Sequence, residues 1–394
     1  MRIILGVSGG IAAYKAAFLA SRLVQQGHEV QVIMTASATK FVQPLTFSSL
    51  TQRTVALSSD ADPIGPLGHV SLAHWAEVLL YAPVTADLLA RSASGRSDDL
   101  LGLVYLGFDG PKLFAPAMEA EMWAHPAVAR NVAQLRRDGV VFVGPKYGRM
   151  ASGRTGEGRL AEPDEIMDAL VAIRTPKDLQ GRSILVTAGA TWEYFDPVRL
   201  LTNPSTGTIG LLLARQALHR GASVNLVVGP GVEVNSPGLA DARIRRAVSG
   251  QDMLAACLDC LDSVDVVVAT AAVSDFRPKE VLPLKAHKED IGLVWEMERT
   301  PDVLRELVRH KQKTTKVIGF AAETDNLVQS GQRKLREKGL DWVVANPVGF
   351  DLGFANLPYH ATIIGPRGVE ALVEGKEATA KAILDRVADP IVTV

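Results

Sequence analysis

Ser8-Gly9-Gly10 lies between an apolar run at residues 3–7 and a helical pattern at residues 12–26. Glycines let a ligand approach the backbone closely, a helix N-terminus attracts anions, and a serine adds a hydroxyl donor. The loop lacks both the glycine spacing of the dinucleotide fingerprint and the Gly-Lys-Ser/Thr of a P-loop. A tight turn without a ligand and a cradle for a single phosphate, as in flavin mononucleotide (FMN), are both compatible with this loop alone.

Polar segments also end the next three predicted strands. They are Thr35-Ala36-Ser37, Ala82-Pro83-Val84-Thr85 and Ala115-Pro116-Ala117-Met118. Open α/β sheets bind ligands at the carboxyl ends of their strands. We therefore expect these segments to meet Ser8-Gly9-Gly10 at one edge of a sheet, which favours the phosphate cradle.

The second half of the chain shows a similar arrangement without detectable sequence identity to the first. A Ser/Thr/Asn/Gly-rich run at residues 202–210 leads into a helix, so hydroxyl and N–H groups point at an anion. Small residues end two further strands, at 269–275 and 319–324, where a base or ribose can lie on the strand tips. Lys334 and Lys338 share one helix face, for which a solvated surface is the alternative interpretation.

Overall composition excludes several classes of protein. The 394 residues contain 42 Lys and Arg against 43 Asp and Glu, so no net field favours nucleic acid or an anionic membrane. Cys257 and Cys260, the two cysteines, are too few for a disulfide-built secreted fold, and we expect a cytoplasmic protein. Their Cys-x-x-Cys spacing lies inside a predicted helix, so two core-facing side chains are favoured over a redox or zinc site. We expect no membrane span, because no apolar run is long enough.

Apolar runs alternate with helical patterns along the whole chain. Strands are predicted at residues 3–7, 30–34, 78–82, 112–115, 140–143, 183–187, 224–228, 264–269, 317–320 and 342–345. Helices are predicted at residues 12–26, 162–173, 210–220, 252–261, 301–310, 329–338 and 378–387. This alternation indicates α/β domains with mostly parallel sheets. Because Thr175-Pro176-Lys177-Asp178 interrupts the pattern, we predict two domains, residues 1–175 and 176–394, each an open sheet with flanking helices.

The motifs of the first half resemble those of the flavin-dependent cysteine decarboxylases. They are most similar to the N-terminal half of the bifunctional phosphopantothenoylcysteine decarboxylase/phosphopantothenate–cysteine ligase family. The resemblance covers about residues 2–173 and rests on residues 6–15, 68–72, 82–87 and 115–118. It implies a flavodoxin-like domain with FMN bound by Ser8, Gly9, Gly10, Thr35, Ser37, Ala82, Pro83 and Thr85.

The same resemblance implies catalytic roles. His69 would be the base that assists oxidation of the cysteinyl group by hydride transfer to the flavin, with a capping or solvated histidine as the alternative. Met118 and Glu119 would be substrate-binding residues, with Glu119 at the position that meets the substrate carboxylate, and Ser152 would lie in a mobile substrate clamp. His74 lacks such support, and a His69–His74 metal pair lacks a third ligand.

Two positions of the first half depart from the family pattern. The family has asparagine where this chain has Glu119, and an ionised Glu119 would repel the substrate carboxylate. The family has cysteine where this chain has Ser152, and a hydroxyl is a poorer acid than a thiol. We expect a retuned decarboxylase, with a catalytically impaired FMN-binding oligomerisation scaffold as the alternative.

The second half resembles the ligase half of the same family, over about residues 179–394. The resemblance implies a Rossmann-like domain that activates 4′-phosphopantothenate with CTP and Mg²⁺ to an acyl-cytidylate, from which cysteine displaces CMP. Asn203 would orient the acyl-cytidylate. The CTP and substrate residues would be Arg199, Ala269, Thr270, Ala271, Asp275, Thr300, Pro301, Asp302, Val303, Phe320, Lys334 and Lys338.

A third departure lies in a lysine-rich segment. The middle lysine of the family's Lys-Ile-Lys-Lys meets the triphosphate, but this chain reads Lys285-Ala286-His287-Lys288. His287, mostly neutral at pH 7, occupies the key position, and Lys285 or Lys288 would take the role. We expect a homo-oligomer, and a more distant alternative is a flavin redox or prenyl-transfer protein fused to an unrelated nucleotide-binding module.

Overall fold

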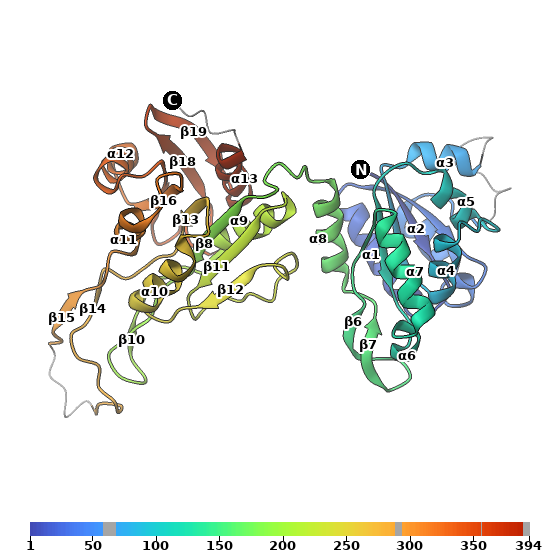
Figure 1. Ribbon diagram of the computed structural model, residues 1–394, viewed down its shortest axis with the longest axis horizontal. Coiled ribbons are helices and arrows are strands. Elements are labelled where there is room, and N and C mark those ends of the chain that lie inside the picture. The colour runs from blue at the N-terminus through green and yellow to red at the C-terminus, as the bar shows by residue number, and fades with distance from the viewer. Residues whose placement is uncertain (58–67, 288–293, 356, 389–394) are drawn as a thin grey trace. The chain divides into compact units, whose positions relative to one another are not determined.

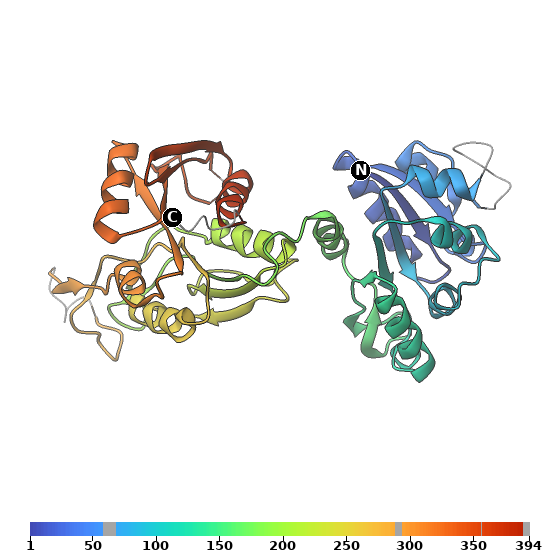
Figure 2. The same ribbon diagram turned by 45° about the horizontal axis from the view of Figure 1, so that its top comes forward.

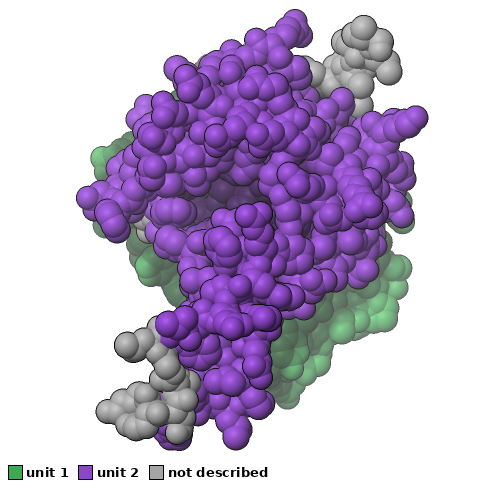
Figure 3. Space-filling model, turned by 90° about the vertical axis from the view of Figure 1, so that its left-hand side faces the viewer, with its two compact units in different colours: residues 1–174 green, residues 175–394 purple. Residues whose placement is uncertain are grey.

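The computed structural model describes residues 1–57, 68–287, 294–355 and 357–388. Lys288, one of the predicted triphosphate ligands, lies outside the described residues. The chain forms two compact units, Met1–Arg174 and Thr175–Val394, drawn in different colours in Figure 3. Each unit is an α/β fold with its own parallel sheet and its own hydrophobic core.

Unit 1 is built on a parallel sheet in the order β2-β1-β3-β4-β5. The strands are β1 (Arg2–Val7), β2 (Glu29–Met34), β3 (Val78–Val84), β4 (Lys112–Pro116) and β5 (Val140–Phe142). This is the flavodoxin-like order, and its ligand crevice lies where the order reverses, between β1 and β3. The fold class predicted from the alternating pattern is confirmed for this unit.

Helices cover both faces of this sheet (Figure 1). One core cluster packs β1 against α1 (Ala13–Gln25), α2 (Pro44–Thr51) and α8 (Pro163–Arg174). The opposite cluster contains α3 (His69–Trp75), α4 (Ala86–Ala93), α5 (Leu100–Gly107) and α7 (Pro126–Arg137). Successive β1 residues alternate between the clusters, as the pleat requires: Ile3 and Leu5 face the first, and Ile4 faces the second.

Three smaller elements complete unit 1. A 3₁₀ turn, η1 (Ala38–Lys40), follows β2, and a one-turn helix, α6 (Ala120–Trp123), follows β4. An antiparallel hairpin, β6 (Lys146–Arg149) with β7 (Thr155–Arg159), packs against α6. The hairpin therefore brings residues 150–154, at its tip, to the segment that follows β4.

Unit 2 has a larger sheet in the order β12-β11-β8-β13-β16-β17-β18-β19. The parallel strands are β8 (Ser183–Ala188), β11 (Ser223–Val228), β12 (Arg243–Arg246), β13 (Val266–Ala269), β16 (Lys316–Glu323) and β17 (Trp342–Pro347). Their order is the Rossmann order 3-2-1-4-5-6, so the ligand crevice lies between β8 and β13. β18 (His360–Gly365) and β19 (Gly368–Glu374) extend this sheet antiparallel.

Helices cover both faces of the second sheet as well, as Figure 2 shows. α9 (Thr208–His219) and α13 (Lys376–Ala388) pack together on one face. α10 (Gly250–Leu261), α11 (Val303–His310) and α12 (Leu327–Lys338) cover the other. Two ribbons lie outside the sheet: β9 (Glu193–Tyr194) with β10 (Leu200–Leu201), and β14 (Phe276–Pro278) with β15 (Met297–Arg299).

The cysteines of α10 have the environment that the sequence predicts. Cys257 and Cys260 are free thiols buried in the core cluster beneath α10. Burial raises the pKa of the Cys257 thiol to about 12, which keeps it protonated and unreactive at neutral pH. Among the described residues, no helix has both the length and the apolar composition needed to cross a membrane.

Candidate active sites

Ser8 joins the two strands that flank the crevice of unit 1. Its hydroxyl donates to the Pro83 carbonyl at 2.7 Å and accepts from the Thr85 N–H at 3.1 Å. Ser8 is almost fully buried, so these bonds hold the end of β1 against the end of β3. The predicted segments 8–10 and 82–85 therefore meet at one point of the sheet edge.

The glycines after Ser8 form a cradle that is open to an anion. A Cβ on Gly9 would lie 2.3 Å from Ser37 Cβ, so only glycine lets this loop pack on the turn after β2. Within the described residues, the N–H groups of Gly9, Gly10 and Ile11 donate no hydrogen bond to the protein. Free N–H groups at the start of α1 suit a phosphate.

Thr35 lies at the same sheet edge, directly after β2. Its hydroxyl accepts from the Ala38 N–H at 3.2 Å and so fixes the turn that carries Ser37. Both residues line a cavity of about 330 Å³, which also includes Arg91 and Asp99. Arg91 pairs with Asp99 at 2.6 Å, so the charge at this wall is largely neutralised.

The segment after β4 closes the edge on its other side. The Ala117 N–H donates to the Val84 carbonyl at 3.0 Å, which places Met118 and Glu119 beside the end of β3. The Met118 N–H donates to the Gly158 carbonyl of β7 at 3.0 Å. The hairpin β6–β7 is thereby fastened to the sheet edge that carries the phosphate cradle.

Ser152 and Glu119, the two departures from the family pattern, contact each other. The Ser152 hydroxyl donates to Glu119 Oε2 at 2.8 Å. A second link between the same elements joins Arg154 to Glu121, with Nη1 and Oε1 2.8 Å apart. The sequence did not predict this pairing.

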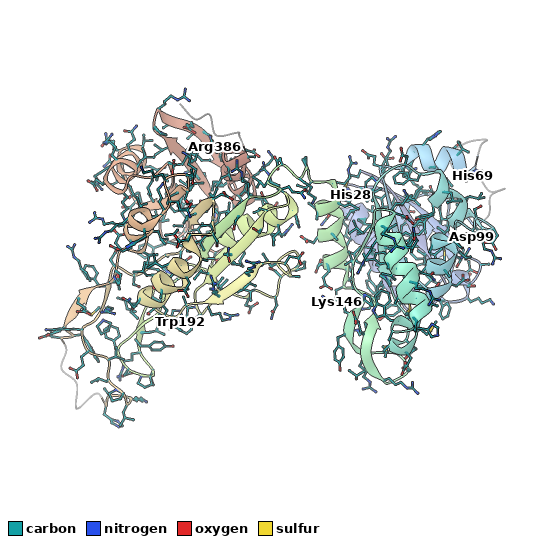
Figure 4. All side chains as sticks on the ribbon, viewed as in Figure 1. His28, His69, Asp99, Lys146, Trp192 and Arg386 are labelled. Carbon is teal, nitrogen blue, oxygen red and sulfur yellow. The ribbon has the colours of Figure 1, made fainter. Side chains whose placement is uncertain are left out.

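His69 is the first residue of α3, half-buried, and Figure 4 labels it on that helix. Gly68 precedes it with a φ of 50°, a left-handed conformation that favours glycine. The segment before Gly68 lies outside the described residues. His74 is exposed in the last turn of α3, and the catalytic role of His69 stays a prediction.

Unit 2 contains a cavity of about 760 Å³ at the predicted crevice. Figure 3 views a face of unit 2 and shows it to be hollowed. The lining includes most of the residues predicted for the nucleotide and the acyl intermediate: Asn203, Ala269, Thr270, Ala271, Asp275, Thr300, Pro301, Asp302, Val303, Phe320, Lys334 and Lys338.

The floor of this cavity is the junction between β8 and β13. The Thr270 hydroxyl donates to the Thr187 carbonyl at 2.6 Å, and the Ala271 N–H donates to the Thr187 hydroxyl at 3.1 Å. α9 begins directly above, with Gly210 packed so closely that an added Cβ would lie 2.6 Å from Ala188 Cβ. The N-terminus of a long helix is therefore held over the cavity, where it favours phosphate oxygens.

The loop before α9 supplies the amide that the sequence predicts. Asn203 Nδ2 donates to the Ala272 carbonyl at 3.2 Å, and the Thr202 hydroxyl donates to the Thr191 carbonyl at 2.8 Å. These bonds tie the loop to the segment after β13 and to the segment after β8. Asn203 is thus fixed among the residues that line the cavity.

Lys334 and Lys338 line the cavity instead of forming a solvated helix face, and both are half-buried. Lys334 Nζ donates to the Phe320 carbonyl at 2.5 Å, and burial together with the Lys338 charge lowers the pKa of Lys334. Lys338 pairs with Asp302 at 2.8 Å. Burial raises the pKa of Asp302, but Lys338 and the Arg305 N–H lower it by more, so the net shift is downward.

Several lining residues escaped the sequence analysis. Arg299, Asn346, Tyr359 and Lys376 also border the cavity. Asn346 is a polar residue directly after the strand predicted at 342–345. A polar residue in that position is the feature that identified the other strand ends. Lys376 lies two residues before the start predicted for α13, and nothing in the sequence marks it.

The structure does not place Arg199, Lys285 or His287 among the described residues that line the cavity. Arg199 Nη1 instead donates to the buried Asp196 carboxylate at 2.5 Å and to the Ala286 carbonyl at 3.1 Å. Asp196 also accepts from the N–H groups of Val198, Arg199 and Ala286. Burial raises the pKa of Asp196, but these donors outweigh burial and lower the pKa to about 2. This network anchors the segment that carries Lys285 and His287, whose contact with triphosphate stays a prediction.

The sequence predicts Mg²⁺ with the nucleotide but does not identify protein ligands for it. Among the described residues, no three His, Cys, Asp or Glu side chains gather into a metal site.

Two family models match the chain, one over each unit. The "Flavoprotein" family model matches residues 1–175, and the "DNA/pantothenate metabolism flavoprotein C-terminal domain" model matches residues 179–391. A crystal structure of the C-terminal domain of a coenzyme A biosynthesis bifunctional protein CoaBC is 36% identical and covers 54% of this chain and 96% of its own, with a TM-score of 0.44.

Two curated relatives are similar over most of their length. The coenzyme A biosynthesis bifunctional protein CoaBC of Bacillus subtilis (strain 168) is 43% identical, over 88% of this chain and 86% of its own. The protein of the same name from Mycobacterium tuberculosis (strain H37Rv) is 40% identical, over 100% of this chain and 96% of its own. The family resemblance inferred from the motifs is thereby confirmed. The chain belongs to the family of coenzyme A biosynthesis bifunctional proteins.

Proposed function

We propose that unit 2 joins cysteine to 4′-phosphopantothenate with CTP, and that unit 1 decarboxylates the resulting 4′-phosphopantothenoylcysteine with FMN to give 4′-phosphopantetheine. The chain is a bifunctional enzyme of coenzyme A biosynthesis with ligase and decarboxylase activities. Beyond these activities, we propose CTP as the nucleotide, an acyl-cytidylate as the intermediate, FMN as the cofactor, and roles for individual residues.

One observation carries the ligase half of the proposal. Segments from many separate parts of unit 2 line a single cavity at the point where the strand order reverses. The cavity combines a helix N-terminus for phosphates, small residues on the strand tips for a nucleoside, and lysines for negative charge. This is the set of groups that a nucleotide and an acidic second substrate require together.

The residues suggest how the ligase works. The N-terminus of α9, with the hydroxyls of Thr206 and Thr208, holds the phosphates, while Lys334 and Lys338 balance their charge. A carboxylate oxygen of 4′-phosphopantothenate attacks the α-phosphorus of CTP, and the bond to pyrophosphate breaks. Asn203 then orients the acyl-cytidylate, the cysteine amine attacks its acyl carbon, and CMP leaves. Mg²⁺ would accompany the triphosphate, held chiefly by phosphate oxygens and water.

The cradle of unit 1 fits the phosphate of FMN. Gly9 and Gly10 offer free N–H groups at the start of α1, beside Ser8, Ser37 and Thr85, at the β1/β3 crevice. The bound flavin supplies a hydride acceptor. His69 takes up the proton released as the substrate is oxidised, and the Met118–Glu119 segment lies beside the substrate carboxylate.

A product analysis tests the proposal. The holoenzyme is incubated with 4′-phosphopantothenate, cysteine, CTP and Mg²⁺, and the products are identified by mass. We expect CMP, pyrophosphate and 4′-phosphopantetheine. Formation of CDP in place of CMP would contradict the acyl-cytidylate, and accumulation of 4′-phosphopantothenoylcysteine would leave unit 1 as an FMN-binding scaffold. Asn203→Ala should still bind CTP but form the amide slowly.

A further inference from the structure

Any decarboxylation must put a proton in the place of carbon dioxide. In the proposed reaction the cysteinyl carbon next to the sulfur first gives up a hydride and the thiol a proton, which leaves a thioaldehyde. Carbon dioxide then departs, and its bonding electrons remain as an enethiolate. One proton added to the carbon that lost carbon dioxide, and return of the hydride to its neighbour, give the product thiolate. The net change is one proton taken up for each carbon dioxide released.

The proton must come from a group at the sheet edge beside the flavin cradle. The hairpin tip presents the Ser152 hydroxyl there, and this hydroxyl already donates to Glu119 Oε2 at 2.8 Å. Glu119 directly follows Met118, whose N–H donates to the Gly158 carbonyl of β7, and the Ala117 N–H, which donates to the Val84 carbonyl, holds the same segment beside the end of β3. A hydroxyl hydrogen-bonded to a carboxyl group is the arrangement that passes a proton from the carboxyl to a third atom.

We propose that Glu119 and Ser152 form a proton relay that completes the decarboxylation, an inference that rests on the proposed function of unit 1. Glu119 is the proton donor, and Ser152 passes its own proton to the substrate carbon while it receives the proton of Glu119. The relay replaces the thiol that the family has at the position of Ser152. Both departures from the family pattern are then parts of one device.

Binding of the substrate causes uptake of the proton that Glu119 needs. When its carboxylate lies beside Glu119, two like charges are adjacent, and one proton shared between the two carboxylates removes the repulsion. The nearest cation on the hairpin tip, Arg154, pairs with Glu121 at 2.8 Å, and Arg149 and Glu157 lie on the two hairpin strands. A protonated Glu119 also donates a hydrogen bond to the substrate carboxylate, which an asparagine amide would otherwise do.

Each step of the relay balances. Carbon dioxide leaves and its bonding electrons delocalise over the enethiolate, while Glu119 retains the shared proton. With the substrate carboxylate gone, the Glu119 O–H turns to the Ser152 oxygen, and the Ser152 O–H turns from Glu119 to the substrate carbon. The carbon then takes the Ser152 proton as the Glu119 proton moves to the Ser152 oxygen. Ser152 ends as it began, and Glu119 ends ionised, ready to take up the next proton when substrate binds.

Anaerobic stopped-flow absorbance of the flavin tests the relay with the FMN-loaded enzyme and 4′-phosphopantothenoylcysteine. In the unmodified enzyme the flavin band should bleach and then recover. In Glu119→Gln and Ser152→Ala the bleaching should persist, while recovery slows by roughly 10²- to 10⁴-fold, the usual contribution of a general acid. The oxidised, decarboxylated enethiol should accumulate, as identified by mass.

Glu121→Gln is the matched control. It removes the other link between α6 and the hairpin tip, so a purely structural latch predicts the same slow recovery in Glu121→Gln as in Glu119→Gln. The relay predicts normal recovery in Glu121→Gln. Recovery in Glu119→Gln as fast as in the unmodified enzyme, or faster because charge repulsion is gone, would overturn the relay.

Calorimetry gives a second readout that needs no turnover. The ligand is the serine analogue of the substrate, which keeps the carboxylate and has a hydroxyl in place of the thiol. Titrations in buffers of different ionisation enthalpy should show uptake of close to one proton per site near pH 7, and none in Glu119→Gln. Equal proton uptake in both proteins would also overturn the relay. An unmodified enzyme whose flavin never bleaches, yet which takes up this proton, would contradict the proposed decarboxylase function and leave the proton-sharing site intact.

Discussion

Replacing Gly210 by alanine tests whether the N-terminus of α9 holds the phosphates of the nucleotide. The added Cβ would lie 2.6 Å from Ala188 Cβ, 2.7 Å from the Thr270 hydroxyl and 3.1 Å from the Thr187 carbonyl. Carbon atoms in contact lie about 3.5–4.0 Å apart, so α9 must move away from the sheet by about 1 Å. The start of the helix would then no longer lie where β8 and β13 define the crevice.

The expected fall in kcat/KM for CTP follows from the overlap between the added Cβ and its neighbours. Overpacking of this kind costs about 1–3 kcal/mol, and each 1.4 kcal/mol is about tenfold in affinity or rate. We therefore expect kcat/KM for CTP to fall roughly 5- to 140-fold. Alanine favours helix over glycine by up to about 1 kcal/mol, so any fall occurs despite a gain in helix propensity.

The assay measures pyrophosphate release at varied CTP, with the flavin content of unit 1 as an internal check on protein quality. Gly231→Ala is the control, because the nearest atom to its new Cβ is 3.8 Å away, an ordinary contact. A Gly210→Ala enzyme within twofold of the unmodified one would refute the phosphate role of α9. Should Gly210→Ala fail to fold, Thr206→Val removes a hydroxyl at the same helix start and should raise the KM for CTP.

Three further outcomes are expected. Gly9→Ala should release FMN, because its Cβ would lie 2.3 Å from Ser37 Cβ, and retention of full flavin absorbance after gel filtration would contradict the cradle. Lys338→Gln should weaken CTP binding by roughly 10- to 100-fold through loss of a charged hydrogen-bond donor, and an unchanged dissociation constant would remove Lys338 from the nucleotide site. Asp196→Asn should lower the melting temperature near neutral pH. Since folding depresses the pKa of Asp196 to about 2, its stabilisation is present above the unfolded-state pKa near 4 and is lost as the pH falls toward 2. The gap in melting temperature should therefore close on acidification, and a pH-independent gap would contradict that account.

The parallel strands could be predicted because they are buried on both faces and so appear as continuous apolar runs. Residues 78–82 and 266–269 are examples, and the polar residues directly after such runs marked both ligand crevices. The hairpin β6–β7 carries no such pattern: its strands are rich in glycine and charge and pair with each other outside the sheet. The sequence therefore identified Ser152 as a site residue but could not predict which residues it contacts.

Long-range contacts account for the rest of what the sequence did not predict. Ser152 and Glu119 are 33 residues apart, and their hydrogen bond depends on how the hairpin folds back on the end of β4. Asp196, the carboxylate that anchors Arg199, lies close to it in the sequence, but only the fold brings Ala286 to Asp196. The homo-oligomer and the roles of Lys285 and His287 remain predictions.

Transfer of an isotope tests the central claim, nucleotide activation of a carboxylate in the cavity of unit 2, most directly. 4′-Phosphopantothenate labelled with oxygen-18 in its carboxylate is incubated with CTP, Mg²⁺, cysteine and the enzyme, and the phosphorus-containing products are analysed by mass. An acyl-cytidylate requires one labelled oxygen to appear in CMP and none in pyrophosphate. Label in inorganic phosphate together with CDP, or unlabelled CMP alongside completed amide, would contradict it.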